Sequence, residues 1–209
     1  MTDPLDTTSD RRPGGRTARV RAQVLDAVRA ELAERGHEGL TMEGVAARAG
    51  VHRATVYRRW RDVGGLLVDV IAAAGEIDWQ PPDTGSLRGD LTALNQEIQE
   101  SLLVRPSFAV ALMAASFHSE QAARAQTQLW NDRYDQCEIL VERALTRGEL
   151  PAQHTDARGL LIAATAPLYH QLVLLRADPD PRLPERAALA AVLAAAAGAF
   201  HIGRDESMR

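Results

Sequence analysis

The chain has 209 residues, of which 45% are hydrophobic and 25% charged, an ordinary composition for a globular protein with a buried core. Its single cysteine, Cys137, excludes an intrachain disulfide framework, and its longest apolar run, residues 187–200, is shorter than the ~20 residues that span a bilayer. Because the first residues also lack an apolar signal core, we expect a cytoplasmic protein with no membrane partner.

Charge is distributed unevenly along the chain, although its formal net value is only −4. Residues 1–62 hold 12 arginines against nine acidic residues, a net of +3, whereas residues 63–209 hold 12 against 19, a net of −7. Such asymmetry is typical of a protein whose nucleic-acid surface is confined to one part, here the N-terminal third.

The N-terminal segment is predicted to be a disordered arm over residues 1–16, followed by a helix over residues 17–35 that ends at Gly36. The arginines of the arm could reach a DNA backbone or minor groove, or belong to a solvated tail. The apolar stripe of the helix consists of Val20, Val24, Ala27, Val28 and Leu32. Abundant alanine and leucine, with no strand pattern anywhere, predict an all-α fold.

Residues 41–60 carry the most informative local pattern, two short helices joined by a tight turn. Thr41 is a good N-cap for the first helix, and Gly50 supplies the turn. The second helix, residues 53–60, is rich in arginine and has Val56 and Trp60 on its buried edge. This pattern predicts a helix-turn-helix whose second helix enters a DNA major groove.

The candidate DNA contacts are polar groups of this unit that point away from the buried edge. They are Thr41, His52, Arg53, Thr55, Tyr57, Arg58 and Arg59. Arg53 lies near the helix N-terminus and can grip guanine O6 and N7, whereas Tyr57 and Arg59 are placed for phosphates. The backbone N–H groups at Thr41 and His52 also suit a phosphate. A solvated charged face is the alternative, which the capped helix and the turn beside it disfavour.

The rest of the chain is predicted to be helical. Asp62 can cap a helix over residues 63–74, and the proline- and glycine-containing stretch 79–86 is the clearest break. We therefore expect a DNA-binding domain over residues 17–78, a C-terminal domain over residues 79–204 and a tail over residues 205–209. Further helices are expected at residues 87–104, 107–118, 119–147, 155–176 and 183–202, with Pro167 kinking the fourth.

Residues 24–67 resemble the N-terminal domain of the TetR (tetracycline repressor) family of transcriptional regulators. The matching residues are Thr41, Val45-Ala46, Ala49-Gly50-Val51, Thr55-Val56-Tyr57, Trp60 and Leu66-Leu67. Residues 139–200 look more loosely like one type of C-terminal domain in this family, through residues 144–150, 167–169 and 178–183. The resemblance implies a repressor that dimerises through its last two helices and binds an inverted-repeat operator in double-stranded DNA. The alanine-rich composition of residues 187–199 agrees with helices that pack closely between two subunits, although a helix in the interior of the fold could have the same composition.

The sequence departs from the family pattern at the ends of its short helices. His52 stands where a better N-cap is usual, and Arg59 stands where histidine is frequent. Val63 replaces a lysine that usually contacts the DNA backbone, and Gly64 and Gly65 follow it, which predicts a soft helix start and one missing phosphate contact. Arg61 could substitute for that contact.

A regulator of this type would also hold a small molecule among its middle helices. The candidate lining residues are Phe108, Leu112, Met113, Phe117, Trp130, Tyr134, Cys137, Tyr169 and His170. They are mostly apolar with a few polar groups, as in many ligand pockets, and a plain helical core would look alike. We expect an apolar or amphipathic effector, with no cofactor and no metal.

Three functional classes can be compared on the sequence alone. The favoured one is a dimeric, sequence-specific transcriptional regulator, most simply a repressor released by its effector. An enzyme is disfavoured, because the six histidines form no metal-ligand motif and no phosphate loop or dinucleotide signature occurs. The third is a helical ligand-binding or scaffold module with a weak or vestigial DNA-binding domain, which only Val63 and the two glycines after it support.

Overall fold

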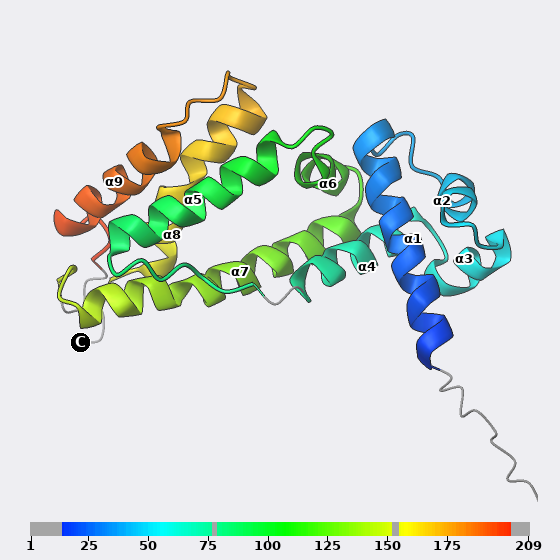
Figure 1. Ribbon diagram of the computed structural model, residues 1–209, viewed down its shortest axis with the longest axis horizontal. Coiled ribbons are helices and arrows are strands. Elements are labelled where there is room, and N and C mark those ends of the chain that lie inside the picture. The colour runs from blue at the N-terminus through cyan, green and yellow to red at the C-terminus, as the bar shows by residue number, and fades with distance from the viewer. Residues whose placement is uncertain (1–13, 77–78, 152–154, 202–209) are drawn as a thin grey trace, which may run out of the picture.

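The computed structural model describes residues 14–76, 79–151 and 155–201, and it confirms the all-α prediction (Figure 1). Its helices are α1 (Gly14–Arg35), α2 (Met42–Ala49), α3 (Arg53–Trp60), α4 (Val63–Gly75), α5 (Leu87–Leu103), α6 (Phe108–Ser116), α7 (Glu120–Thr146), α8 (Ala157–Tyr169), the π-helix η1 (His170–Leu174) and α9 (Leu183–Ala196). Within those described ranges, the only β-type pairing is an isolated bridge between Thr155 and His201.

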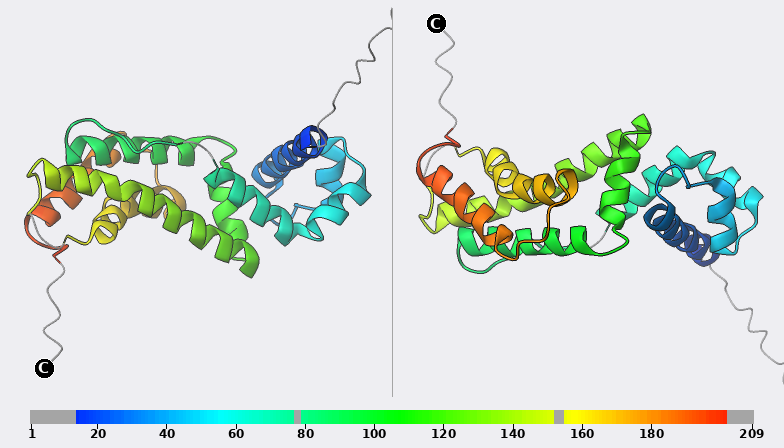
Figure 2. Two further views of the ribbon diagram at one scale, coloured as in Figure 1. Left: turned by 90° about the horizontal axis from the view of Figure 1, so that it is seen from below. Right: turned by 90° about the horizontal axis from the view of Figure 1, so that it is seen from above.

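The molecule is elongated, with α1–α3 gathered at one end and α5, α8 and α9 at the other (Figures 1 and 2). Helix α4 packs along the first part of the long helix α7, so these two helices connect the ends. None of the described helices combines the length and the apolar character that crossing a membrane requires.

Side-chain caps fix several helix starts where the sequence predicts them. Thr41 Oγ1 accepts a hydrogen bond from the Gly44 N–H at 3.0 Å, and Asp62 Oδ1 accepts one from the Gly65 N–H at 2.8 Å. An N-cap contributes about 1 kcal/mol. That contribution matters most for α2, which has only eight residues and would not be stable as an isolated helix.

The first four helices share one core, and that core extends into the C-terminal half. Its fully buried members include Val24, Val28, Leu32, Val45, Val56, Leu66, Leu67 and Val70. Leu112 and Ala115 of α6 and Ala122 of α7 belong to the same cluster. The stacked rings of His37 and His118, with centroids 5.0 Å apart, add a contact between the two halves. The DNA-binding end is therefore packed onto α6 and α7 rather than tethered by α4 alone.

A second core lies among α5, the later part of α7, α8 and α9. Asn95 of α5 is fully buried and donates hydrogen bonds to the carbonyls of Ala164 in α8 (3.0 Å) and Pro184 in α9 (3.1 Å). Asp90, also fully buried, accepts hydrogen bonds from the backbone N–H and the hydroxyl of Thr84. These buried polar contacts fix α5 against its neighbours and against the connecting segment before it.

The main differences from the sequence prediction concern helix ends. Helix α1 begins at Gly14 rather than Thr17, so residues 14–16 of the predicted arm are helical, while residues 1–13 lie outside the described residues, as does the predicted tail. Helix α8 ends at Tyr169, two residues after Pro167, and the chain continues as the π-helix η1. A change in helix geometry is expected here because proline lacks the N–H that a regular helix uses. Helix α9 ends at Ala196, because Gly198 adopts a left-handed conformation with φ 83°.

Candidate nucleic-acid interface and internal cavity

Helices α2 and α3 form the predicted helix-turn-helix. Gly50 ends α2 in the left-handed conformation, with φ 64° and ψ 30°, and its N–H donates back to the carbonyl of Ala47. Val56 and Trp60 of α3 are buried, at 0% and 5% exposure, so the rest of this helix faces outward. The turn thus presents α3 as a mostly exposed helix held by one edge.

His52 caps α3, although histidine was expected to be a weak cap. Its Nδ1 atom accepts a hydrogen bond from the Ala54 N–H, and the 3.3 Å distance is longer than those of the Thr41 and Asp62 caps. The imidazole therefore takes the place of a hydroxyl or carboxylate at this helix start. The His52 side chain is otherwise exposed.

The exposed face of α3 is organised by a carboxylate from α2. Glu43 Oε1 lies 2.8 Å from Arg53 Nη2 and accepts a hydrogen bond from the Tyr57 hydroxyl, also at 2.8 Å. The Arg53 guanidinium stacks over the Tyr57 ring, 5.1 Å from its centroid. The hydrogen bond from Tyr57, followed by a backbone hydrogen bond and the charge of Arg53, holds the pKa of Glu43 below its usual value. Sequence reasoning did not select Glu43 as a site residue and missed these contacts.

The other candidate DNA contacts lie around this cluster. Arg58 and Arg59 are exposed, and the Arg59 guanidinium lies over the Trp60 ring at 5.1 Å from its centroid. Arg58 has no hydrogen-bond or ion-pair partner within the part of the chain that the structure describes. Thr55 is half-buried, and the Thr41 hydroxyl is occupied by its cap. The structure therefore brings Arg53, Tyr57, Arg58 and Arg59 to one accessible helix and uses Thr41 to hold α2.

A hydrogen-bond network of partly buried side chains holds the C-terminal end of α3. Asp69 of α4 accepts hydrogen bonds from Arg21 Nη2 of α1 at 2.6 Å and from the Trp60 indole N–H at 2.8 Å. Burial raises the pKa of Asp69, but these two donors lower it by more, so the net shift is downward. The network joins α1, α3 and α4 and was not predicted, because Arg21 and Asp69 are 48 residues apart.

The two glycines at the start of α4 have a packing role. A Cβ atom on Gly65 would lie 2.3 Å from the Trp60 carbonyl oxygen, and one on Gly64 would lie 2.9 Å from Gln121 Oε1 of α7. With Asp62 capping it, α4 begins firmly at Val63, which corrects the expectation of a soft start. Arg61, the proposed substitute for the missing lysine, is exposed just before it.

A cavity of about 400 Å³ lies among α5, α6, α7 and α8. Seven of the nine predicted lining residues border it, namely Phe108, Leu112, Met113, Trp130, Tyr134, Cys137 and Tyr169. Phe117 does not, because it ends α6 on the surface with 87% of its area exposed. His170 does not either, because it is exposed at the start of η1.

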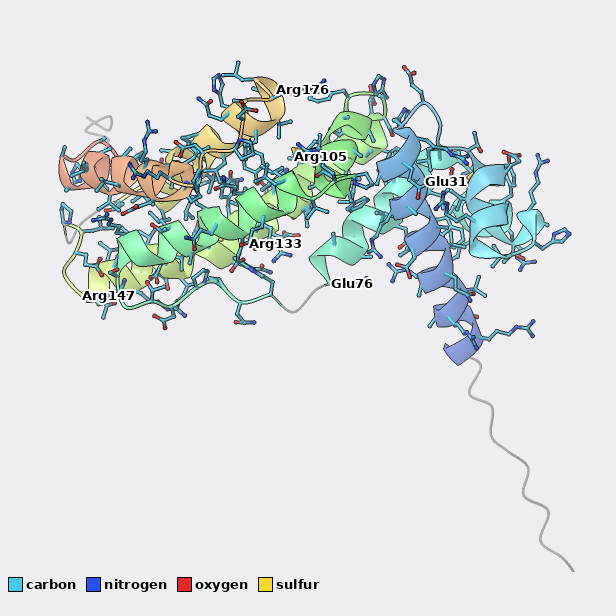
Figure 3. All side chains as sticks on the ribbon, turned by 45° about the horizontal axis from the view of Figure 1, so that its top comes forward. Glu31, Glu76, Arg105, Arg133, Arg147 and Arg176 are labelled. Carbon is cyan, nitrogen blue, oxygen red and sulfur yellow. The ribbon has the colours of Figure 1, made fainter. Side chains whose placement is uncertain are left out.

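Several lining residues were missed, among them Ala74, Trp79, Glu97, Gln126 and Arg133. Gln126 and Arg133 share one face of α7 with Trp130, Tyr134 and Cys137, so helical spacing alone could have found them. Arg133 lies midway along the long axis, between Glu76 at the end of α4 and Arg147 at the end of α7 (Figure 3).

The two charged side chains of the cavity, Glu97 and Arg133, contact uncharged groups. Trp79 donates its indole N–H to Glu97 Oε2 at 2.7 Å, and the Arg133 guanidinium stacks over the Trp79 ring at 4.9 Å from its centroid. Arg133 also donates to the carbonyl of Ala74, near the end of α4. Elsewhere in the described residues, no group of three or more His, Cys, Asp or Glu side chains is placed to hold a metal ion.

Comparison with known proteins agrees with both halves of the structure. Residues 24–70 match the family model described as bacterial regulatory proteins, tetR family, and residues 81–191 match the tetracyclin repressor-like C-terminal domain. The HTH-type transcriptional regulator AqdR of Rhodococcus erythropolis is 30% identical over 190 residues, covering 90% of this chain and 89% of that protein.

Two further proteins bear on the functional interpretation. The DNA-binding transcriptional repressor TetR of Mycobacteroides abscessus is 28% identical over 142 residues, covering 66% of this chain and 74% of that protein. Among solved structures, the SmeT–triclosan complex has a TM-score of 0.59 at 21% identity, covering 86% of this chain and 90% of SmeT.

Proposed function

Since this chain belongs to the TetR family of transcriptional regulators, a family of DNA-binding proteins and not of enzymes, we propose that it is a dimeric repressor released from an inverted-repeat operator by a small molecule. The observation that carries the proposal is the exposed basic face of α3, which a capped α2 and the Gly50 turn project from the rest of the domain.

The charge and shape of α3 suggest that its side chains make different kinds of contact with DNA. Arg53, in the first turn, is placed to read a guanine edge, whereas Tyr57, Arg58 and Arg59 are placed for phosphates. Phosphate contacts set the register and base contacts set the specificity. His52, with its ring at the helix N-terminus, is proposed to contribute a further phosphate contact.

An apolar stripe across α8 and α9 supports dimerisation through these helices. Ile162 is 43% exposed and Leu193 is 61% exposed, and Ala166 and Ala190 are exposed one turn from them. Small and apolar side chains on two adjacent helices allow a second copy to pack closely, as in a four-helix bundle. His170, the first residue of η1, is exposed four residues after Ala166, which gives this residue an alternative to its predicted pocket role.

The position of the cavity supports release by an effector. Ala74 of α4 lines it, and so does Phe108, whose ring lies 6.0 Å from the Arg29 guanidinium of α1. A molecule that fits the cavity in only one arrangement of these helices would favour that arrangement and shift α3 with it. SmeT, which shares this fold, was solved with triclosan bound.

The alternative of a ligand-binding module with a vestigial DNA domain loses part of its support. Gly65, one of the two glycines that suggested it, is required where α4 meets the backbone of Trp60, because an added Cβ atom would lie 2.3 Å from the Trp60 carbonyl oxygen. Val63 still removes one phosphate contact relative to the family pattern, which predicts a lower affinity rather than no binding.

Selection of bound duplexes from a random pool tests the proposal. We expect enrichment of an inverted repeat with half-sites about one helical turn apart, and an affinity that falls steeply with salt. Arg53→Ala should lose base preference, whereas Arg88→Ala, at an exposed arginine of α5 at the opposite end of the molecule from α3, is the matched control. Failure to enrich any site at low salt would overturn the proposal.

A further inference from the structure

We propose that the cavity accepts an uncharged aromatic molecule carrying an N–H or O–H group, which it donates to the side-chain carbonyl of Gln126. This inference rests on the proposed function only in taking the cavity as the effector site. It is carried by an unpaired amide oxygen, by charged groups that already have neutral partners and by a wall of aromatic rings.

Among the described residues, Gln126 Oε1 is one of three buried side-chain oxygens without a hydrogen-bond partner, and the one of the three that borders the cavity. Gln126 borders the cavity from α7. A carbonyl that is shielded from water and unpaired is unfavourable, so a ligand donor placed there would satisfy it.

The two charged groups of the cavity wall already contact neutral groups of the fold. Glu97 is bonded to Trp79, and Arg133 contacts the Trp79 ring and the Ala74 carbonyl. Burial raises the pKa of Cys137 to about 11 and also raises that of Tyr169, so both side chains stay neutral near pH 7. A carboxylate ligand would have to draw Arg133 away from these contacts, and its oxygens can only accept, so it would leave Gln126 Oε1 without a donor.

The aromatic wall defines the rest of the ligand. The Trp130 and Tyr169 rings meet edge to face, with centroids 5.4 Å apart, and Tyr134 follows at 6.1 Å from Trp130. Such rings favour a further ring over an aliphatic chain. Because Gln126 precedes Trp130 by four residues, the donor should lie ~6 Å from the ring contact, measured along α7. That separation and a cavity of about 400 Å³ fit a fused bicyclic compound.

Three naphthalenes of nearly equal size test each element of this proposal. They are 2-naphthol, which donates a hydrogen bond, 2-methoxynaphthalene, which does not, and 2-naphthoate, which is charged. Calorimetry with the full chain should show 2-naphthol binding about tenfold tighter than 2-methoxynaphthalene. We expect no binding of 2-naphthoate.

Two variants assign the preference to the amide. Gln126→Leu should bring the two neutral probes to within about twofold of each other, mainly by weakening 2-naphthol. Gln126→Met repeats the test with an unbranched side chain, and both variants are checked for native circular dichroism. Gln128→Leu, on an exposed glutamine of the same helix, should behave as wild type.

Three outcomes would overturn the inference: tight binding of 2-naphthoate, a preference for 2-naphthol that survives in both Gln126 variants, or binding of no probe at all. DNA affinity measured on the same preparation separates these outcomes from a failure of the proposed function. A chain that binds its operator and ignores all three probes remains a regulator with a different effector.

Discussion

Replacing Asp69 with asparagine should weaken the attachment of α3 to α1 and α4, while the DNA-facing side chains of α3 stay unchanged. The carboxylate now receives both the Arg21 guanidinium and the Trp60 indole N–H. Asparagine offers one carbonyl oxygen and no charge, so one of the two donors loses its partner. Hydrogen bonds to a charged group contribute about 1.5–3 kcal/mol. The Asp69 and Arg21 side chains are 22% and 25% exposed, and screening by solvent brings the expected loss to about 2 kcal/mol.

A loss of that size should lower the melting temperature by about 4–8 °C in a chain of this length. Thermal unfolding followed by circular dichroism measures it, and Asp26→Asn, which alters a carboxylate of α1 that is 73% exposed, is the control. A double-mutant cycle with Arg21→Gln should show that the two losses are not additive. If Asp69→Asn has the same melting temperature as wild type, or if the losses in the cycle are additive, the proposal that the network stabilises the fold as a unit is refuted.

The pH dependence gives a second readout of the same network. Because the pKa of Asp69 is lower in the folded protein than in the unfolded chain, its stabilising contribution is present above about pH 4. It is lost as the pH falls through the folded value. The stability difference between wild type and Asp69→Asn should therefore be constant near neutral pH and shrink only below about pH 4.

Four further predictions address the other sites. Arg53→Ala should cost about 1–3 kcal/mol of operator affinity and relax the preference at one base pair, whereas Arg58→Ala should weaken binding evenly across sequences, both measured by titration of labelled duplexes. Thr41→Ala should lower the unfolding free energy by about 1 kcal/mol through loss of the α2 cap, measured in urea. Leu193→Glu should convert the dimer to a monomer in light scattering, because it places a charge on the α8–α9 stripe. Cys137 should react slowly with iodoacetamide at pH 8, since burial raises its pKa to about 11, and rapidly once the protein is unfolded.

Each of these predictions has an outcome that contradicts it. Unchanged base preference in Arg53→Ala means that α3 docks differently, and unchanged stability in Thr41→Ala means that water replaces the cap. A Leu193→Glu protein that stays dimeric places the dimer seam elsewhere, and Ala72→Glu, at an exposed position of α4, is its matched control. Rapid alkylation of native Cys137 would show that the cavity opens readily.

The local features of the fold could be predicted because they depend on neighbours in sequence. The caps at Thr41 and Asp62, the turn at Gly50 and the bounds of α3 each follow from residues within four positions of one another. Helix ends were less accurate, since a run of alanines such as residues 194–197 favours a helix until a glycine with positive φ ends it. The π-helix η1, which follows Tyr169, has no sequence feature nearby that predicts it other than Pro167.

The candidate site residues also divide into those that helical spacing could identify and those that it could not. The outward residues of α3 follow from its buried edge, so helical spacing was enough to identify them. The ion pair between Arg21 and Asp69, and the arrangement of Glu43 beneath Arg53, depend on how helices cross, which spacing does not encode. In the cavity, the prediction found seven lining residues and missed both apolar ones, such as Trp79 and Leu129, and the polar Gln126, Glu97 and Arg133. The polar ones were missed because polar side chains on a helix face are more often solvated than enclosed.

The contact between Glu43 and Arg53 also bears on how the protein searches DNA. A duplex that recruits Arg53 must first take it from a carboxylate 2.8 Å away. Phosphates and guanines can both accept two hydrogen bonds from the fork of a guanidinium, so either could replace the carboxylate. Glu43 is therefore expected to compete with any duplex for Arg53 and to lower the affinity of every site, cognate or not.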